Sequence, residues 1–149
     1  MLKGLDPLLT PALLYHLASM GHGDEVAVVD RNFPASATGR RLVRLAGSGL
    51  VAVAEAVLAV LPLDQFVPAP VAVMTREGNP QDLAVAVEAV VEMSAAAAGR
   101  PVDFEPLAPQ SFYRRARLSF LVVATGEEQL YGCVLLRKGV VYPGGRVRA

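Results

Sequence analysis

Short, almost continuously apolar segments recur along this chain, many of them rich in valine and other β-branched residues. Such segments, bounded by glycine, proline or polar turn residues, are typical of strands buried on both faces of a sheet. The pattern predicts strands over residues 26–29, 42–45, 71–74, 102–104, 120–124 and 132–137.

Between these segments the apolar positions change to helical spacing. Three start signals accompany this change, at Thr10, Ser48 and Asn79, and a proline follows the first and the third. Side-chain oxygens at such positions cap free backbone amides, and proline suits the first helical position because an amide would be unpaired there. We predict helices over residues 11–20, 49–61, 80–98 and 110–117, with a glycine ending the first and the third.

Strands that alternate with helices, and that are apolar throughout, indicate an α/β fold with a mostly parallel sheet and helices on both faces. The 149 residues fit one domain, and at this length folding buries roughly 68–70% of the surface of the unfolded chain. We find no repeat or linker and predict a single domain over residues 1–149.

The charge balance excludes broad classes of partner. Fourteen basic and 14 acidic residues leave no net charge, so no field attracts nucleic acid or an anionic membrane. The dense cluster formed by Arg114, Arg115 and Arg117 is typical of a solvated helix face. With 53% apolar and 19% charged residues the chain is not disordered, and this composition favours some surface covered by partner subunits.

The longest apolar stretch, residues 49–63, contains Glu55 and Pro62 and is shorter than the roughly 20 apolar residues of a spanning helix. No secretory signal opens the chain, so we expect a cytoplasmic protein. Cys133 is the only cysteine, which excludes an internal disulfide and a cysteine-built zinc site. Two histidines separated by a helix match no metal-ligand spacing, and we predict no metal.

His22 is the first candidate for chemistry. It stands between two glycines directly after the first predicted helix, where small neighbours leave the imidazole open to a ligand. The helix C-terminus favours the protonated ring, and a group that titrates near neutrality can pass protons both ways. The alternative is a histidine at a helix end with no further role.

Two further segments could contact a ligand. Asp30 closes a buried strand, and ligands of α/β sheets gather beyond the carboxyl ends of strands, where a carboxylate can bind sugar hydroxyls. Tyr131 and Cys133 flank Gly132 where a turn enters the last strand, and strand alternation places their side chains on one face. Tyrosine there can stack on a sugar or be a core aromatic. No glycine-rich phosphate turn precedes Asp30, so a nucleotide-binding regulator is disfavoured.

Several segments together resemble the RbsD/FucU family, and they span nearly the whole chain. The first half carries the opening Met1-Leu2-Lys3-Gly4, Asp6-Pro7-Leu8-Leu9-Thr10-Pro11, the specific segment Met20-Gly21-His22-Gly23-Asp24-Glu25, and Asp30 with Asn32-Phe33-Pro34-Ala35. The second half carries Phe112-Tyr113 with Arg115-Ala116, Ala124-Thr125-Gly126-Glu127, Tyr131-Gly132 and Leu136-Arg137-Lys138-Gly139-Val140. These last segments resemble the L-fucose mutarotase branch more than the D-ribose pyranase branch.

The resemblance implies a cofactor-free isomerase that interconverts anomers or ring forms of a monosaccharide. It also implies a ring-like homo-oligomer, often a decamer, with active sites between subunits. By the same resemblance His22 matches the proton donor, Asp30 the sugar-binding aspartate, and Tyr131 and Gly132 the start of a sugar-binding tripeptide. That tripeptide ends in Cys133 where the family commonly has asparagine.

Two more positions depart from the family pattern. Pro109 replaces a basic residue, and Arg31 replaces a small one. Because of these departures we expect L-fucose or a related monosaccharide as the sugar and do not restrict the prediction to L-fucose. The departures at Pro109 and Cys133 leave open an alternative, a non-catalytic sugar-binding or transport-accessory protein of the same fold.

The spacing between His22 and Asp30 raises a geometric difficulty. His22 precedes the predicted strand and Asp30 ends it, and the steps from Glu25 to Asp30 span about 16 Å when extended. Either the segment around His22 folds back along the sheet, or one site combines residues of neighbouring subunits.

Overall fold

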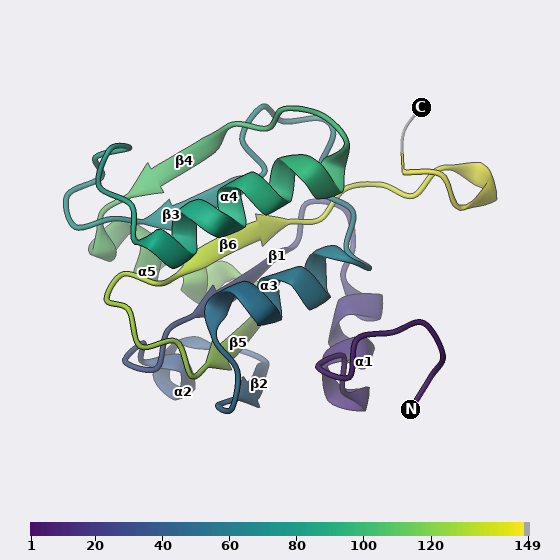
Figure 1. Cartoon of the computed structure of the whole chain (residues 1–149), viewed down its shortest axis with the longest axis horizontal. Coiled ribbons are helices and arrows are strands. Elements are labelled where there is room, and N and C mark those ends of the chain that lie inside the picture. The colour runs from purple at the N-terminus through teal and green to yellow at the C-terminus, as the bar shows by residue number, and fades with distance from the viewer. Residues whose placement is uncertain (148–149) are drawn as a thin grey trace.

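The computed structural model describes residues 1–147, which form one six-stranded sheet in the order β2-β5-β1-β6-β3-β4 (Figure 1). The strands are β1 (Glu25–Val29), β2 (Leu42–Leu45), β3 (Val71–Met74), β4 (Phe104–Leu107), β5 (Leu121–Thr125) and β6 (Val134–Arg137). β2, β5 and β1 pair in parallel, as do β3 and β4, whereas β6 runs antiparallel to both of its neighbours, β1 and β3. The prediction of a mostly parallel sheet is confirmed.

Helices cover both faces of this sheet, as predicted. They are α1 (Pro11–Ser19), α2 (Ala35–Thr38), α3 (Leu50–Leu58), α4 (Val85–Ala98) and α5 (Pro109–Leu118), followed by a 3₁₀ turn at Pro143–Gly145. Among residues 1–147 no helix is both long and apolar enough to cross a membrane.

Two apolar cores, one on each face, hold the layers together. Side chains of α1, α3 and α4 pack with alternate strand residues such as Val26 and Val28, and α3 and α4 lie in front of the sheet in Figure 1. Phe112 and Ala116 of α5 pack on the other face with the intervening residues, such as Ala27. Because successive strand side chains point to opposite faces, the apolar strands serve both cores at once.

The start of α1 agrees with the sequence prediction, but two later helix starts were wrong. The Leu13 amide donates to the Thr10 hydroxyl, as expected of a cap. The cap of α3 is Gly49 and not Ser48, and the Leu50 amide donates to the Glu127 carboxylate at 3.0 Å.

Asn79 does not start α4, which begins at Val85. The Asn79 side chain instead accepts from the Gln81 amide within a turn, and the Ala86 amide of α4 donates to the Gln129 side chain. Four strand starts also differ from the prediction. β4 (Phe104–Leu107) and β6 begin two residues later than predicted, β5 begins one residue later, and β1 begins one residue earlier.

The antiparallel course of β6 decides which residues meet. β6 starts at the edge where β1 ends, and it ends at the edge where β1 begins, as its pairing of Glu25 with Arg137 shows. Asp30 therefore lies on the same side as the segment before β6, and His22 on the same side as the segment after it.

Candidate active site

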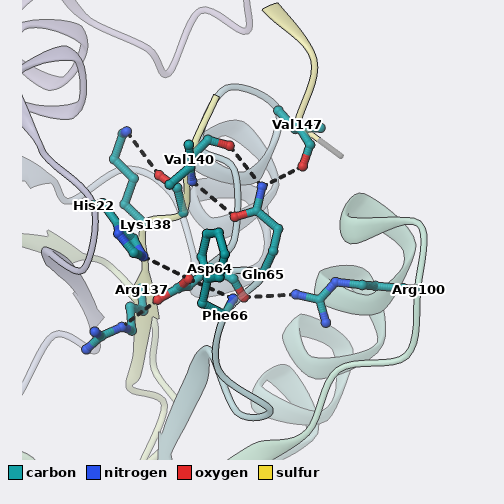
Figure 2. Close-up of polar contacts among 10 residues, drawn as sticks. His22, Asp64, Gln65, Phe66, Arg100, Arg137, Lys138, Val140 and Val147 are labelled. Carbon is teal, nitrogen blue, oxygen red and sulfur yellow. Dashed lines mark hydrogen bonds and ion pairs between the residues drawn. The ribbon is translucent and has the colours of Figure 1, made fainter. Parts of the chain in front are cut away.

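The candidate residues form two separate groups at opposite edges of the sheet. The first, called here the histidine cluster, consists of His22, Asp64, Phe66 and Arg137 (Figure 2). The second, called here the aspartate cavity, is a cavity of about 160 Å³. It is lined by Asp30, Asn32, Phe33, Met74, Pro109, Tyr113, Leu130, Tyr131 and Cys133.

A tight turn presents His22, whose side chain is 46% exposed. The Gly21 amide donates to the Asp24 carboxylate at 2.7 Å, and the Gly23 amide donates to the Lys138 carbonyl at 2.9 Å. Gly23 has a φ of +86°, and a Cβ there would lie 3.1 Å from the Arg137 guanidinium. Position 23 therefore favours glycine for two reasons: its φ is positive, and the Arg137 guanidinium leaves little room for a side chain.

Asp64 holds the imidazole from inside the protein, although it lies in a loop. Its side chain is only 1% exposed, and one carboxylate oxygen lies 3.1 Å from His22 Nε2. The other oxygen accepts from Arg137 Nε at 2.8 Å, and the Phe66 amide donates to the first at 3.0 Å. Burial raises the pKa of Asp64, but the Phe66 amide, Arg137 and His22 together hold it below its ordinary value.

The loop that carries Asp64 is paired to the chain beyond β6. The Asp64 amide donates to the Arg137 carbonyl, and Arg100 Nη2 donates to the Asp64 carbonyl, both at 2.9 Å. The Gly139 amide donates to the Pro62 carbonyl at 2.8 Å. A Cβ at Gly139 would lie 2.9 Å from the Asp64 Cα, so only glycine allows this approach.

Glu25, the first residue of β1, connects the start of this strand to α5. Arg115 donates to the carboxylates of Glu25 and Glu105, each at 2.6 Å. Burial lowers the pKa of Arg115, but the two carboxylates outweigh it and raise the pKa above its ordinary value. The prediction that the arginine cluster is a solvated helix face is therefore wrong for Arg115.

Asp30, directly after β1, is buried at the floor of the aspartate cavity. One carboxylate oxygen accepts from the Asn32 amide at 3.0 Å, and the Cys133 thiol lies 3.4 Å from the other. Burial and then the charge of Asp30 raise the pKa of Cys133 well above its ordinary value. Cys133 thus remains a neutral thiol that donates weakly to Asp30.

The turn before β6 brings Tyr131 and Cys133 to the same cavity. Tyr131 lies outside the strand with a φ of +60°, so the turn, and not strand alternation, sets its direction. Gly132 between them has no room for a side chain, because a Cβ would lie 2.9 Å from Glu127 Cγ. Pro109, the first residue of α5, lines the cavity, and the Arg76 guanidinium lies 5.7 Å from the Tyr131 ring centroid.

The structure thus brings Asp30, Tyr131 and Cys133 together and leaves His22 apart. The segment around His22 does not fold back along the sheet, because His22 pairs with Asp64 at the opposite edge. Within residues 1–147 no group of three or more histidine, cysteine, aspartate or glutamate side chains is placed to hold a metal ion.

The sequence prediction missed Asp64 and Arg137. Asp64 is the one charged residue in the proline-punctuated segment 62–70, and Arg137 directly follows an apolar strand. An acidic residue placed among apolar neighbours needs a cationic or hydrogen-bonding partner, which is the signal that could have singled it out.

Comparisons with known proteins agree with this architecture. The model of the RbsD / FucU transport protein family matches residues 3–141. Fucose mutarotase of Homo sapiens is 44% identical over 145 residues, covering 94% of both chains, and L-fucose mutarotase of Glaesserella parasuis is 39% identical over 94% and 96%. A crystal structure of the fucose mutarotase of Streptococcus pneumoniae with L-fucose superposes with a TM-score of 0.82 at 30% identity, over 95% of this chain and 100% of that one.

Proposed function

The chain belongs to the RbsD/FucU family, and we propose that it is a mutarotase that interconverts the anomers of L-fucose or a closely related monosaccharide. The observation that carries the proposal is an exposed imidazole, His22, held by a buried carboxylate in a chain similar to fucose mutarotases over 94% of its length. Histidine is the side chain that most often acts as a general acid or base near neutral pH, and proton transfer is what mutarotation of a sugar requires.

Mutarotation is an acid-base reaction. The anomeric hydroxyl loses its proton, the bond between the anomeric carbon and the ring oxygen breaks, and the ring oxygen gains a proton to give an open-chain aldehyde. The carbonyl group rotates, and the reverse steps close the ring on the other face. No electrons leave or enter the sugar, so acid-base groups alone can carry the reaction.

In this reaction His22 supplies the proton, while Asp30 and Tyr131 hold sugar hydroxyls. The Asp30 carboxylate can accept further hydrogen bonds from sugar hydroxyls. Tyr131, which lines the same cavity, can pack against the apolar face of a sugar ring. General acid-base catalysis of this kind contributes a factor of about 10² to 10⁴ in rate.

The two residue groups act on one sugar only if neighbouring subunits combine them. Strand β1 and its flanking residues separate His22 from Asp30, a span of about 16 Å or more. Phe66 of the histidine cluster is 62% exposed, and Leu130 of the aspartate cavity is 65% exposed. Large apolar side chains at both groups support an interface there. We therefore include in the proposal a cytoplasmic homo-oligomer, of the ring or decamer type, with composite sites.

A second candidate function is sugar binding without turnover, in a transport-accessory protein. Pro109 and Cys133 favour it, because both line the aspartate cavity and both depart from the family pattern. This candidate predicts that a sugar binds but that its anomers do not exchange faster than in buffer.

Saturation-transfer NMR over a panel of L-fucose, D-ribose and D-galactose tests both candidates. The native chain should accelerate anomer exchange of at least one sugar, and His22→Ala should lose most of that acceleration with its circular dichroism unchanged. His16→Ala, a change of the same residue type in α1, is the matched control and should keep full activity. If the native chain binds a sugar but does not accelerate its anomer exchange, the accessory-protein candidate is favoured. Full activity of His22→Ala would refute the assignment of His22 as the proton donor.

A further inference from the structure

The aspartate cavity has one charged residue in its lining, Asp30, and no basic one. An ionised carboxylate only accepts hydrogen bonds, and the proline side chain of Pro109 in the same lining has nothing to donate. A sugar hydroxyl both donates and accepts, so its oxygen also needs a donor from the protein. Asn32 and Tyr131 can provide neutral donors. A positively charged donor is the group that this lining lacks.

The end of β3 brings an arginine to this edge of the sheet. β1 and β3 both run antiparallel to β6, so Asp30 and the segment after Met74 lie at the same edge. The Met74 amide donates to the Cys133 carbonyl at 3.0 Å, and the Thr75 amide donates to a carbonyl of β4 at 2.9 Å. Met74 also lines the cavity. The backbone is therefore held on both sides up to the residue before Arg76.

Tyr131 provides a platform for the guanidinium of Arg76. The guanidinium carbon lies over the Tyr131 ring, 5.7 Å from its centroid, which is within the roughly 6 Å of a cation–π contact. The Cys133 amide donates to the Tyr131 carbonyl at 2.9 Å, so the turn that carries the ring is itself fixed. Because the same ring lines the cavity, the contact places a positive charge beside the cavity wall.

Arg76 differs from the arginines that have a structural partner. Arg31, Arg115 and Arg137 each form an ion pair with a carboxylate. In the part of the chain that the structure describes, the exposed guanidinium of Arg76 forms no hydrogen bond or ion pair. All five of its N–H donors are therefore available to a ligand.

We propose that Arg76 is a substrate-binding residue, which donates hydrogen bonds to sugar oxygens at the wall of the aspartate cavity. This inference rests on the proposed function. Asp30 then accepts from a hydroxyl at the floor of the cavity, and Tyr131 packs against the apolar face of the ring. The planar fork of the guanidinium can donate two parallel hydrogen bonds, which favours a sugar with two neighbouring oxygens directed to that wall.

Sugar affinity of three variants tests this assignment. Isothermal titration calorimetry with L-fucose, D-ribose and D-galactose compares the native chain with Arg76→Gln, Arg76→Lys and Arg117→Gln. Arg76→Gln should raise the Kd of the preferred sugar about tenfold, because hydrogen bonds from a charged group are lost. Arg76→Lys keeps the charge but loses the fork, so its Kd should rise roughly threefold. Arg117→Gln, an exposed arginine in the last turn of α5, is the matched control and should bind like the native chain.

Nitrogen-15 NMR of the arginine side chains gives a readout that does not depend on activity. Titration of the native chain with the preferred sugar should shift one Nε–Hε resonance, and that resonance should be absent from Arg76→Gln. If Arg76→Gln changes the circular dichroism spectrum, the shift in the native chain still decides.

The outcomes separate this inference from the proposed function. An unchanged Kd for Arg76→Gln, or a sugar that shifts no arginine resonance of Arg76, would overturn the inference while anomer exchange by the native chain upholds the function. A native chain that neither binds a sugar of the panel nor accelerates its anomer exchange would overturn the proposed function, and the role of Arg76 with it.

Discussion

His22 and Asp30 lie at opposite ends of the same strand: His22 precedes Glu25, where β1 begins, and Asp30 follows Val29, where it ends. Each has partners of its own, Asp64 for His22 and Cys133 for Asp30. One sugar cannot contact both residues of a single chain. In the proposed mechanism the arrangement of subunits is therefore part of the chemistry, and this composite site can be tested without a structure of the assembly.

Mixed oligomers of His22→Ala and Asp30→Asn chains should regain activity. Each variant alone lacks one half of every composite site, whereas random assembly restores both halves in about a quarter of the sites. The two chains are co-expressed with different affinity tags, the mixed species is isolated, and its anomer-exchange rate is measured.

The matched control pairs His22→Ala with a chain that carries both substitutions. No intact site can form in that mixture, so it should stay inactive. Mixed oligomers of the two single variants that show no recovery, although native mass spectrometry detects both chains in one particle, would contradict the composite site.

Asp30→Asn should weaken sugar binding more than it perturbs the fold. Asn keeps the size of the side chain but loses the charge, and hydrogen bonds to charged groups contribute about 1.5–3 kcal/mol. We expect the Kd for the preferred sugar to rise roughly 10- to 100-fold, measured by isothermal titration calorimetry. Asp103→Asn, which changes an exposed carboxylate, is the control, and equal affinity of the two variants would argue against a sugar contact at Asp30.

The Cys133 thiol should resist modification in the folded protein. Its pKa is raised by burial and by Asp30, so at about pH 8 the reactive thiolate is scarce, and the side chain is 1% exposed. Ellman's reagent should label the native chain far more slowly than the chain unfolded in guanidinium chloride. Rapid labelling of the native protein would show that reagents reach Cys133 more easily than its 1% exposure indicates.

The contribution of Asp64 to stability should depend on pH. Because its pKa in the folded state lies below the unfolded value of about 3.9, this stability is present above that value and is lost as the pH falls through the folded-state pKa. Near pH 5–6 we expect Asp64→Asn to lower the free energy of unfolding by about 1–3 kcal/mol.

The difference in the free energy of unfolding between the native chain and Asp64→Asn should then shrink below about pH 4, because a protonated Asp64 no longer forms the ionic contacts that asparagine lacks. Urea unfolding of both chains at several pH values measures it. A difference that stays constant down to about pH 2 would show that the carboxylate is not ionised in the native cluster.

Gly139→Ala should disturb the histidine cluster from a distance. The added Cβ would lie 2.6 Å from the Leu63 carbonyl and 2.9 Å from the Asp64 Cα, so the loop must move. Overpacking of this kind costs about 1–3 kcal/mol, and the displaced Asp64 should lower the anomer-exchange rate.

Gly47→Ala is the matched control for Gly139→Ala, because a Cβ at Gly47 meets no atom within 4 Å. Thermal unfolding and anomer exchange are measured for both. Equal stability of the two variants would mean that the loop at Asp64 accommodates the methyl group without strain.

The elements that local sequence determines were predicted well. Strands β2 and β3 have the predicted bounds, the Thr10 cap is present, and Gly99 ends α4 in the left-handed conformation. These features depend on residues within one or two turns of each other. For the same reason the exposure of His22 between two glycines could be foreseen.

The errors arose where distant residues replace a local signal. Glu127 binds the first amide of α3 from 77 residues away, and Gln129 binds the start of α4 from 43, so neither Ser48 nor Asn79 is needed as a cap. A side chain brought in by the sheet can satisfy a free amide as well as a local one can.

The candidate site follows the same division. By itself the sequence determined which residues have the right chemistry: an exposed histidine, an aspartate at a strand end, and a tyrosine before the last strand. Only the tertiary structure decided their partners, because the antiparallel course of β6 brings Arg137 to Asp64 across 73 residues and Asp64 to His22 across 42. A buried ion pair exists only once the chain has folded around it, since burial is what makes its partners necessary.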